Sequence, residues 1–583
     1  MRFLALATDY DNTIATNGRV ADATWAAIDR LRESGRHAVL VTGRELSDLM
    51  TVCPHVDRFS RVVAENGGVL YDPATRESRL LADPPPQSFV DALRERGLAN
   101  FSVSQTLVAT MKPNEIIALE LIRDLALDLH VVFNGDAVMI VHPGVSKASG
   151  LLAALDELQL SALNVVGVGD AENDHALISA CGMAVAVGNA LPALKQHADL
   201  VTSLPDGQGV CQLIDAIIAD DLRSRSSSLD KCRLPIGARH DVVGAEPVSI
   251  DAYGSVVLVI GGSGSGKSTA SAMLIEKLEE AGHQLCIFDP EGDCSNDEYT
   301  TVVGSARSAP DEEEVLQLLQ DARGQRAVAV NMMRVAPGER PQCCVQLLLR
   351  LQALRAKTGR PNWLVFDEAH HLFPAQWASA DGTMPGFESG LLITVNADQL
   401  APAVLRQVNV VIATGDDALE RLKSFATATG NEPPDGPSSA VSRGEALFWR
   451  PSDGVVCVVT LGKGHRQQRR HRRKYAEGLL IPERSFYFRG PGDRLNLRAH
   501  NLVLFIELAE GVDRDTWLYH LRRGDYSRWF REVIDDDDLA NEACEIERDD
   551  SLTPKESLER MRGAVFHRYT QPENPTLPKL EPQ

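Results

Sequence analysis

Short apolar runs alternate with amphipathic stretches over the first 220 residues. The apolar runs are FLALATD, HAVLVTG, RVVAEN, LNVVGVGD and MAVAVGN, and the stretches between them, such as DATWAAIDRLRESG and KASGLLAALDELQL, have helical spacing. Continuously apolar runs that alternate with helices are typical of parallel strands buried on both faces. The pattern therefore predicts a doubly wound α/β domain over residues 1–220.

The alternation changes between about residues 72 and 145. A helical pattern (QSFVDALRERG), strand patterns (FSVSQTLVATM), a second helical pattern (NEIIALELIRDLAL) and two strands around an NGD turn (LHVVFNGDAVMIVHPG) follow one another there. Such a turn between two apolar runs favours a hairpin. We interpret this segment as a small α+β cap inserted into the first domain.

A second α/β pattern covers residues 236–460, with the apolar runs SVVLVIG, QLCIFDP, AVAVNMM, NWLVFDE, GLLITVN and VNVVIATG. The polar, Ser/Arg-rich segment 221–235 before it is predicted to be a linker. A basic connector at 461–480 and a helical domain at 481–570 follow, and the Pro-rich tail at 571–583 is expected to be disordered. The predicted fold class is α/β: two Rossmann-like or P-loop parallel-sheet domains, an α+β cap and a mostly helical C-terminal domain. The aromatic spacing of WLYHLRRGDYSRWF in the last domain favours core packing over binding.

Composition and charge narrow the class of protein. The chain has 583 residues, of which 44 % are hydrophobic and 24 % charged, and its net charge is −22. This charge disfavours a general nucleic-acid coat, although a local basic patch could still bind phosphates. The ten cysteines form no CxxC pair, which predicts reduced thiols in a cytoplasmic protein without a zinc site. No apolar run reaches about 18 residues, so we expect neither a signal peptide nor a transmembrane helix.

Two aspartates, Asp9 and Asp11, stand directly after the first apolar run, in the stretch ATDYDNTIATNGR. Open α/β sheets place their ligand sites at this end of the strands. A carboxylate can attack phosphorus to form an aspartyl-phosphate, and a second carboxylate can act first as general acid and then as general base. Thr42, in VLVTGR, can bind a phosphate oxygen, and Lys147, at the start of a helical pattern, can offset the developing negative charge.

Further carboxylates follow another apolar run, in the stretch VGVGDAENDHAL, where Asn173 lies between two aspartates. Anions this close to a phosphate require cations, and Mg²⁺ suits carboxylate and phosphate oxygens. The sequence therefore predicts a magnesium site. Its predicted carboxylates are Asp9, Asp11, Asp170 and Asp174.

These motifs, in this order, resemble the haloacid dehalogenase superfamily of phosphatases. The matches are Asp9, Asp11 and Thr13 for the DxDxT signature, and Thr42, Lys147 and Asp170 with Asp174 for the later motifs. The position of the insert, and AENGGVLYD just before it, resemble the branch of Cof-type and sucrose-phosphate phosphatase-like enzymes. The resemblance covers about residues 1–215. It implies that Asp9 is the nucleophile and Asp11 the acid/base.

The cap bears on the substrate. In this superfamily a cap closes over the site and selects small phosphorylated molecules, and this compact cap resembles those of phosphoglycolate and sugar-phosphate phosphatases. The resemblance therefore implies Mg²⁺-dependent hydrolysis of a small phosphorylated metabolite of one of these classes. The insert could equally be a stabilising lid without selectivity.

A second phosphate-binding motif, GGSGSGKS, follows the apolar run VVLVI. It fits G-x-x-x-x-G-K-[ST], in which backbone N–H groups and a helix N-terminus wrap a polyphosphate such as that of ATP. Lys267 is expected to reach the β- and γ-phosphates, and Ser268 to bind a Mg²⁺ ion. The predicted nucleotide-binding residues are Gly261, Gly262, Ser263, Gly264, Ser265, Gly266, Lys267, Ser268 and Thr269.

The stretch NWLVFDEAHHLFP supplies the carboxylates that such a site needs. Asp367 ends an apolar run and is placed to hold the water shell of the metal ion. Glu368 beside it is placed to polarise an attacking water, which favours hydrolysis of the nucleotide over transfer of its phosphate.

The residues around this site resemble the HerA/FtsK class of ring-forming ATPases over about 234–460, from LPIG and CIFDPEGD to LLITVNADQLAPAVLRQVNVVIATG. Many members carry Thr-Gln at the sensor position, where this chain has Thr394 and Asn396. The resemblance implies a hexamer in which a neighbouring copy supplies an arginine. Arg406 and Arg443 are candidates for it.

The segment HRQQRRHRRK at 465–474 could contact DNA phosphates. It could equally be a solvated segment that pairs with acidic runs such as DDDD at 535–538. Two functions therefore stay open: a metabolite phosphatase that its ATP-binding domain regulates or assembles, and a DNA-associated HerA-like ATPase or translocase that carries a phosphatase domain. A polynucleotide kinase–phosphatase is disfavoured, because the cap would obstruct a nucleic-acid end. One of the two domains could also be a binding module only.

Overall fold

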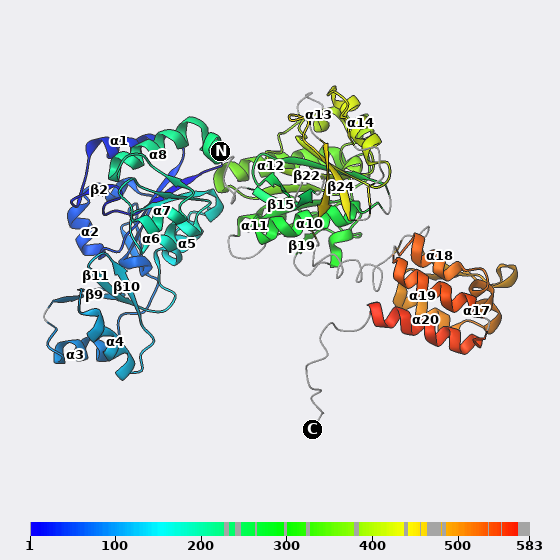
Figure 1. Cartoon of the computed structure of the whole chain (residues 1–583), viewed down its shortest axis with the longest axis horizontal. Helices are drawn as coiled ribbons and strands as arrows, with labels where there is room; N and C mark the ends of the chain where they lie inside the picture. The colour runs from blue at the N-terminus through cyan, green and yellow to red at the C-terminus, as the bar shows by residue number, and fades with distance from the viewer. Residues whose placement is uncertain are drawn as a thin grey trace.

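A computed structural model gives the structure of the protein (Figure 1). It describes residues 2–98, 100–226, 233–239, 246–262, 265–296, 300–321, 327–377, 384–436, 441–442, 444–454, 456–462, 480, 485–534, 536–549 and 551–569. The predicted fold class is confirmed within these residues, with two α/β sheet units, a small α+β insert and a mostly helical C-terminal unit. The basic segment 465–474 and the tail 571–583 lie outside the described residues.

The first sheet has eight strands in the order β14-β13-β12-β1-β4-β5-β6-β7. The strands from β14 to β5 are parallel, and β6 and β7 extend the edge in antiparallel fashion. Because β1 and β12 are parallel neighbours, the residues that follow them meet at one edge of the sheet. The strands are β1 (Ala5–Thr8), β4 (His37–Val41), β5 (Arg61–Ala64), β6 (Val69–Asp72), β7 (Glu77–Leu80), β12 (Val165–Gly169), β13 (Met183–Ala186) and β14 (Leu200–Val201), beside a small ribbon of β2 (Ala15–Thr16) and β3 (Arg19–Val20).

Helices cover both faces of this sheet, because successive side chains along a strand point to opposite faces. Leu6 of β1 joins the core formed with α1 and α8, whereas Ala5 and Ala7 join the core formed with α5 and α6. The helices are α1 (Asp22–Glu33), α2 (Leu46–Val52), α5 (Lys147–Glu157), α6 (Asp174–Ala180), α7 (Pro192–His197), α8 (Asp206–Asp220) and α9 (Arg223–Ser226).

The cap is a four-stranded antiparallel sheet in the order β10-β11-β9-β8, packed against α3 and α4. The NGD hairpin is confirmed, since Asn134 pairs with Ala137 across the turn. The predicted start near residue 72 is too early, because β7 pairs with β6 in the first sheet; all four side chains of β7 are exposed, so no apolar pattern marks this strand. The elements are α3 (Gln87–Glu95), β8 (Phe101–Val103), β9 (Leu107–Met111), α4 (Glu115–Asp124), β10 (His130–Asn134) and β11 (Ala137–Val141).

The second sheet has eleven strands in the order β16-β15-β25-β24-β23-β17-β22-β21-β18-β20-β19. The predicted apolar runs are its parallel strands β17, β18, β20, β21, β22 and β23. The linker predicted for 221–235 ends before Arg233, where β15 begins and pairs with β16; polar and proline residues between Leu234 and Ile250 hide this pattern in the sequence. The strands are β15 (Arg233–Arg239), β16 (Glu246–Asp251), β17 (Val256–Gly261), β18 (Leu285–Asp289), β19 (Thr300–Val303), β20 (Ala327–Asn331), β21 (Trp363–Phe366), β22 (Gly390–Thr394), β23 (Val410–Thr414), β24 (Glu445–Trp449) and β25 (Val456–Leu461).

This second sheet also has a core on each face. Leu258 and Ile260 of β17 pack with α12 and α14, whereas Val257 and Val259 pack with α10. The helices are α10 (Lys267–Glu280), α11 (Glu312–Gln320), α12 (Arg340–Thr358), α13 (Pro402–Leu405) and α14 (Ala418–Thr429).

The C-terminal unit packs five helices and a two-stranded ribbon around an aromatic core. Phe486 lies 5.4 Å from Phe505 and 5.4 Å from Trp529, centroid to centroid, as expected for core packing. The elements are β26 (Phe486–Phe488), β27 (Leu497–Ala499), α16 (Leu502–Gly511), α17 (Arg514–Leu521), α18 (Asp525–Glu532), α19 (Asp537–Arg548) and α20 (Pro554–Tyr569). Among the described residues, no helix has both the length and the apolar character needed to cross a membrane.

Candidate active sites

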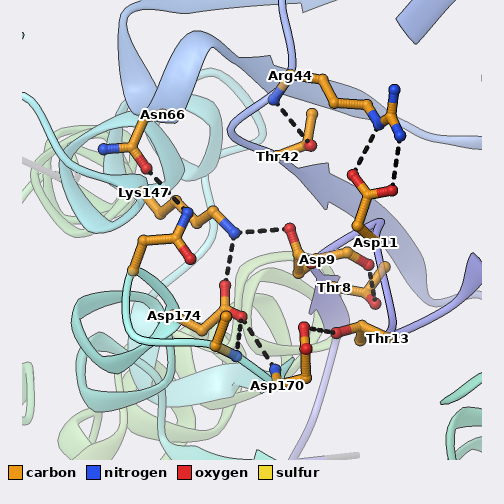
Figure 2. Close-up of polar contacts among 12 residues, drawn as sticks. Thr8, Asp9, Asp11, Thr13, Thr42, Arg44, Asn66, Lys147, Asp170 and Asp174 are labelled. Atoms are coloured by element: carbon orange, nitrogen blue, oxygen red, sulfur yellow. Dashed lines mark hydrogen bonds and ion pairs between the residues drawn. The ribbon is translucent and has the colours of Figure 1, made fainter. Parts of the chain in front are cut away.

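Asp9 and Asp170 meet at the carboxyl edge of the first sheet (Figure 2). Each follows a buried strand directly, and the N–H of Asp9 donates to the carbonyl of Val168 at 3.1 Å. Asp174 begins α6 after the next turn, and its Oδ2 accepts the backbone N–H groups of Asp170 at 2.9 Å and Ala171 at 3.0 Å. The turn that links the strand to the helix therefore fixes the carboxylate of Asp174 beside that of Asp170.

Lys147 joins two of these carboxylates. It is the first residue of α5, whose start is fixed by a capping box between Ser146 and Ser149. Its Nζ lies 2.6 Å from Asp9 Oδ1 and 2.6 Å from Asp174 Oδ1, and its side chain is fully buried. A buried ammonium group of this kind is a fixed positive charge against the two anions.

The concentration of negative charge changes how these carboxyl groups titrate. Burial raises the pKa of Asp9 to about 8, an effect that Lys147 opposes and Asp174 reinforces. Burial, together with the charge of Asp174, raises the pKa of Asp170 to about 6. Burial alone would lower the pKa of Lys147, but the two carboxylates outweigh it and raise that pKa above its ordinary value. The single ammonium group of Lys147 therefore does not balance the negative charge of the three carboxylates.

The donor atoms fit a hard divalent cation. Ligand oxygens of Asp9, Asp170 and Asp174 all lie within 4.8 Å of one another, and carboxylate oxygens suit Mg²⁺. Asn173 is buried beside them, and its Oδ1 has no hydrogen-bond partner among the described residues, while its Nδ2 donates to Asn66 at 3.3 Å. A buried oxygen without a partner is costly unless a ligand or a water meets it. These residues could therefore hold Mg²⁺.

Asp11 lies apart from this group. Its carboxylate accepts two hydrogen bonds from Arg44, each at 2.7 Å, and Arg44 also pairs with Asp48. Within the described residues, the structure does not bring the Asp11 carboxylate into the cluster of metal-ligating type. Arg44 was not singled out from the sequence, although it ends the quoted stretch VLVTGR.

Both threonines of the motifs are buried at the same edge. The Thr42 hydroxyl accepts the backbone N–H of Arg44 at 3.2 Å, and the Thr13 hydroxyl donates to Asp170 at 3.1 Å. Thr13 therefore orients a carboxylate of the cluster.

The cap contacts the core at the rim of the site. The carboxylate of Glu65 accepts the backbone N–H and the hydroxyl of Thr106, both at 2.8 Å. Met139 of β11 reaches the loop after β4, where a Cβ added at Gly43 would lie 3.3 Å from its sulfur. Sequence reasoning left these cap residues unidentified, because neither is a charged or a motif residue.

The glycine-rich loop of the second sheet leads from β17 into α10. Gly266 has a φ of +92°, a conformation that side chains disfavour, and α10 begins at the next residue, Lys267. The Ser265 hydroxyl donates to the carbonyl of Gly262 at 2.9 Å and lies 2.8 Å from the Thr414 hydroxyl. Among the predicted nucleotide-binding residues, Ser263 and Gly264 lie outside the described residues; Gly261 ends β17, and Ser268 and Thr269 stand in the first turn of α10.

Asp367 and Glu368 follow β21, two strands away from the loop. Glu368 Oε1 lies 2.7 Å from Lys267 Nζ, and Glu368 itself has a φ of +39°, an uncommon conformation that clusters at functional sites. The second carboxylate oxygen lies 3.5 Å from His370 Nδ1, which lies 3.1 Å from the Thr394 hydroxyl. The predicted sensor residue Thr394 thus reaches Glu368 through a histidine that the sequence did not single out.

An arginine of α14 also lies at the glycine-rich loop. A Cβ added at Gly262 would lie 3.2 Å from Nη2 of Arg421, and the same guanidinium binds the side chain of Asn396 and pairs with Asp417 at 2.7 Å. Of the two arginines named from the sequence, Arg406 is exposed and its Nε donates to the carbonyl of Pro402, whereas Arg443 lies outside the described residues. No sequence motif marks Arg421.

Comparison with known proteins identifies the first of these units. Residues 6–110 and 114–214 match the haloacid dehalogenase-like hydrolase family. The chain is 32 % identical over 220 residues to a phosphoglycolate phosphatase of Methanothermobacter thermautotrophicus, covering 36 % of this chain and 96 % of that protein. It is 30 % identical over 217 residues to a phosphoglycolate phosphatase of Archaeoglobus fulgidus, covering 36 % of this chain and 95 % of that protein. The crystal structure of a haloacid dehalogenase-like hydrolase from Bacteroides thetaiotaomicron covers 37 % of this chain and 99 % of its own, at 19 % identity and a TM-score of 0.34.

Through its N-terminal region, the chain therefore belongs to the haloacid dehalogenase-like hydrolases. Residues 250–426 match an AAA domain, so the protein joins a hydrolase of this family to a P-loop domain. The prediction of an enzyme of the phosphoric monoester hydrolase type is confirmed at the level of its family.

Proposed function

We propose that the N-terminal unit is a Mg²⁺-dependent phosphatase that works through an aspartyl-phosphate on Asp9. The observation that supports this most strongly is the contact of Lys147 with Asp9 and Asp174, at 2.6 Å each, inside a cluster of three carboxylates. A cluster with this much negative charge suits a metal ion and an incoming phosphate together. When bound, Mg²⁺ would polarise the phosphoryl oxygens and offset their charge.

The chemistry divides between two carboxyl groups. An Asp9 oxygen attacks the phosphorus of a phosphate monoester, and the bond between phosphorus and the leaving oxygen breaks. Asp11 gives its proton to that leaving oxygen and later takes a proton from the water that attacks the aspartyl-phosphate, which frees Asp9 and releases inorganic phosphate. In the structure Asp11 accepts two hydrogen bonds from Arg44 at the rim of the site; because the general acid must carry a proton, Asp11 has to leave Arg44 and be protonated when it faces the leaving group. Lys147 and Thr42 would bind the phosphoryl oxygens.

The proposed substrate is a small phosphorylated metabolite of the sugar-phosphate or phosphoglycolate class. The contacts of Thr106 and Met139 with the core support this size limit, because they hold the cap close to the phosphate site. The phosphoglycolate phosphatases among the relatives match the same region of the chain. The described cysteines are free thiols, which supports a cytoplasmic location.

Removal of divalent metal tests this proposal. We expect chelation by EDTA to lower phosphate release from a panel of small phosphoesters by about 10²- to 10³-fold, since metal stabilisation of the transition state contributes several kcal/mol. Added Mg²⁺ should restore the rate, whereas Ca²⁺ with its looser geometry should not. Equal phosphate release with and without EDTA would contradict the metal assignment.

For the AAA domain we propose binding and hydrolysis of ATP. Lys267 is the phosphate ligand, Ser268 and Asp367 hold Mg²⁺, and Glu368 orients the attacking water. The contact of Lys267 with Glu368 at 2.7 Å supports these roles, because it brings the ammonium and the carboxylate together beside the glycine-rich loop.

Arg421 is the fourth charged group of this proposed site, beside Lys267, Asp367 and Glu368. We expect Arg421→Ala to lower ATP turnover by about 10- to 100-fold, the usual cost of losing a hydrogen bond to a charged group. The measurement is steady-state ATP hydrolysis by the full chain. Lys423→Ala, which removes an exposed lysine paired with Glu420 on the same helix, should leave the rate unchanged; an equal loss in both variants would contradict the role of Arg421.

A motor of the HerA type is the second candidate function. The match of residues 250–426 to an AAA domain and the basic segment 465–474 favour it. This function requires a hexamer and ATP hydrolysis that rises on addition of DNA. Sedimentation of the full chain with ATP, together with ATPase rates with and without duplex DNA, tests both requirements, and a monomer whose rate ignores DNA would exclude it.

A further inference from the structure

The two sheet units contact each other directly. The contact lies at the beginnings of their strands, whereas the candidate sites lie at the ends of the strands. The amino terminus lies at this junction (Figure 1). Arg360 of the second unit is 6 % exposed, and its Nη2 donates to the carbonyl of Leu160 in the first unit at 2.6 Å. Tyr253 donates its hydroxyl to the carbonyl of Leu163 at 3.4 Å, and the guanidinium of Arg2 stacks on its ring at 3.9 Å. A buried guanidinium group that donates a hydrogen bond to a carbonyl of another unit makes a specific contact.

The backbone of the second unit also lies close to a side chain of the first unit at this junction. Gly359 has a φ of +72°, and a Cβ added there would lie 2.2 Å from Oδ1 of Asn164. Asn164 is buried, and its Nδ2 donates to the carbonyl of Arg2 at 2.6 Å. Glycine suits this position because its φ is positive and because a Cβ would meet the Asn164 amide, so the backbone of one unit fits closely against a side chain of the other.

A buried histidine adds to the same surface. His283 is 2 % exposed, and its ring lies 5.3 Å from that of Tyr253. Burial, with the positive charge of Arg2, lowers its pKa to about 4. The imidazole ring is therefore neutral at pH 7, and it does not repel the positive charge of Arg2 beside it.

The residues at the junction stand where strands that lead to the sites begin. In the first unit, Arg2 precedes β1, which leads to Asp9, and Asn164 precedes β12, which leads to Asp170. In the second unit, Tyr253 precedes β17, which leads into the glycine-rich loop, and Arg360 precedes β21, which leads to Asp367 and Glu368. Each of these strands is only four to six residues long. A shift at one end of such a short, buried strand is carried to its other end, because packed interiors deform little.

Resting on the proposed function, we propose that this junction, built by Arg360, Tyr253 and Gly359 against Arg2, Leu160 and Asn164, is an interaction surface through which nucleotide binding at the P-loop regulates the phosphatase site. Its occupant is the other unit of the same chain. The two sites face away from each other, so neither can hand substrate to the other, and the coupling runs through the strands. A nucleotide that shifts the first residues of β21 or β17 also shifts the first residues of β1 and β12 across the junction. In return, a ligand at the phosphatase site must change the affinity of the P-loop for nucleotide.

Hydrogen exchange of the full chain tests this coupling. Exchange is compared with and without adenylyl imidodiphosphate and Mg²⁺ for three proteins: the wild type, Arg360→Ala and Tyr253→Ala. In the wild type we expect the analogue to slow exchange in α10 and, by at least about fivefold, in residues 160–170, within the usual range of coupling between sites. In both junction variants α10 should keep its protection, while the effect on residues 160–170 should be lost. Arg350→Ala removes a half-exposed arginine of α12, the helix that ends just before Arg360; it pairs with Glu313, and the variant should behave as the wild type.

Three outcomes would overturn the coupling. One is protection of α10 in the wild type without any change in residues 160–170. Another is an unchanged effect in both junction variants. The third is absence of protection at α10, which would contradict nucleotide binding itself and with it any regulation by nucleotide. Failure of the phosphatase assignment is seen separately, as absence of phosphate release from phosphoesters, because this experiment does not depend on turnover. Retained protection of α10 in Arg360→Ala and Tyr253→Ala also shows that these variants are folded.

Discussion

Asp9→Asn is expected to abolish phosphate release from small phosphoesters, lowering the rate by at least about 10⁴-fold, as removal of a nucleophile does in other hydrolases. An amide cannot attack phosphorus, and no other described carboxylate replaces it, since Asp174 is held by Lys147 and by two backbone N–H groups. The measurement is inorganic phosphate released by the full chain with Mg²⁺ from a panel of sugar phosphates and phosphoglycolate.

The loss should be chemical rather than structural. Asp9 is 4 % exposed and burial raises its pKa to about 8, so ionising this carboxyl group is costly, and a neutral amide of the same shape should shift the thermal midpoint by only a few degrees. Asp29→Asn, which weakens a half-exposed pair with Arg58 on the same unit, should retain full activity. An Asp9→Asn protein that is folded and still releases phosphate at the wild-type rate would exclude the aspartyl-phosphate.

Lys267→Ala should lower ATP hydrolysis by about 10²- to 10³-fold, comparable to the removal of one preorganised donor from a transition state. The ammonium group of Lys267 pairs with the carboxylate of Glu368. The alanine variant therefore loses both the proposed phosphate ligand and the ion-pair partner of Glu368. We expect nucleotide affinity, measured by calorimetry with adenylyl imidodiphosphate, to weaken as well.

A lysine on the same helix serves as the matched control. Lys277 pairs with Glu280 at the exposed end of α10, and Lys277→Ala should hydrolyse ATP as the wild type does. An intact ATPase rate in Lys267→Ala would show that the P-loop is not the site of hydrolysis.

The parallel strands of both sheets could be predicted because their residues are apolar without interruption. Strands with mixed character escaped prediction. In β15, a proline separates Leu234 from Ile236, and in β7 every side chain is exposed. Such strands form because a neighbouring strand offers its edge, and that edge exists only in the folded sheet. The same limit displaced the start of the cap and the end of the linker.

The candidate sites follow the same rule. Asp9, Lys147, Asp170 and Asp174 could be predicted to meet because each stands in a motif of known order, and the structure brings them together. Arg44 and Arg421 could not, because arginines on a loop and on a helix look like surface residues until the fold places them against Asp11 and Gly262. The junction between the units had no signal either. It depends on backbone carbonyl groups, a glycine and a few polar side chains such as Arg360, and their role is set only when the fold brings the two units together.

The central claim is that one chain holds two separate phosphate chemistries. Phosphate release from a small phosphoester and from ATP, measured in parallel for the wild type, Asp9→Asn and Lys267→Ala, tests it most directly. We predict a crossed result: Asp9→Asn loses only phosphoester hydrolysis, and Lys267→Ala loses only ATP hydrolysis. Loss of both activities in a single folded variant, or hydrolysis of ATP that depends on Asp9, would contradict the account.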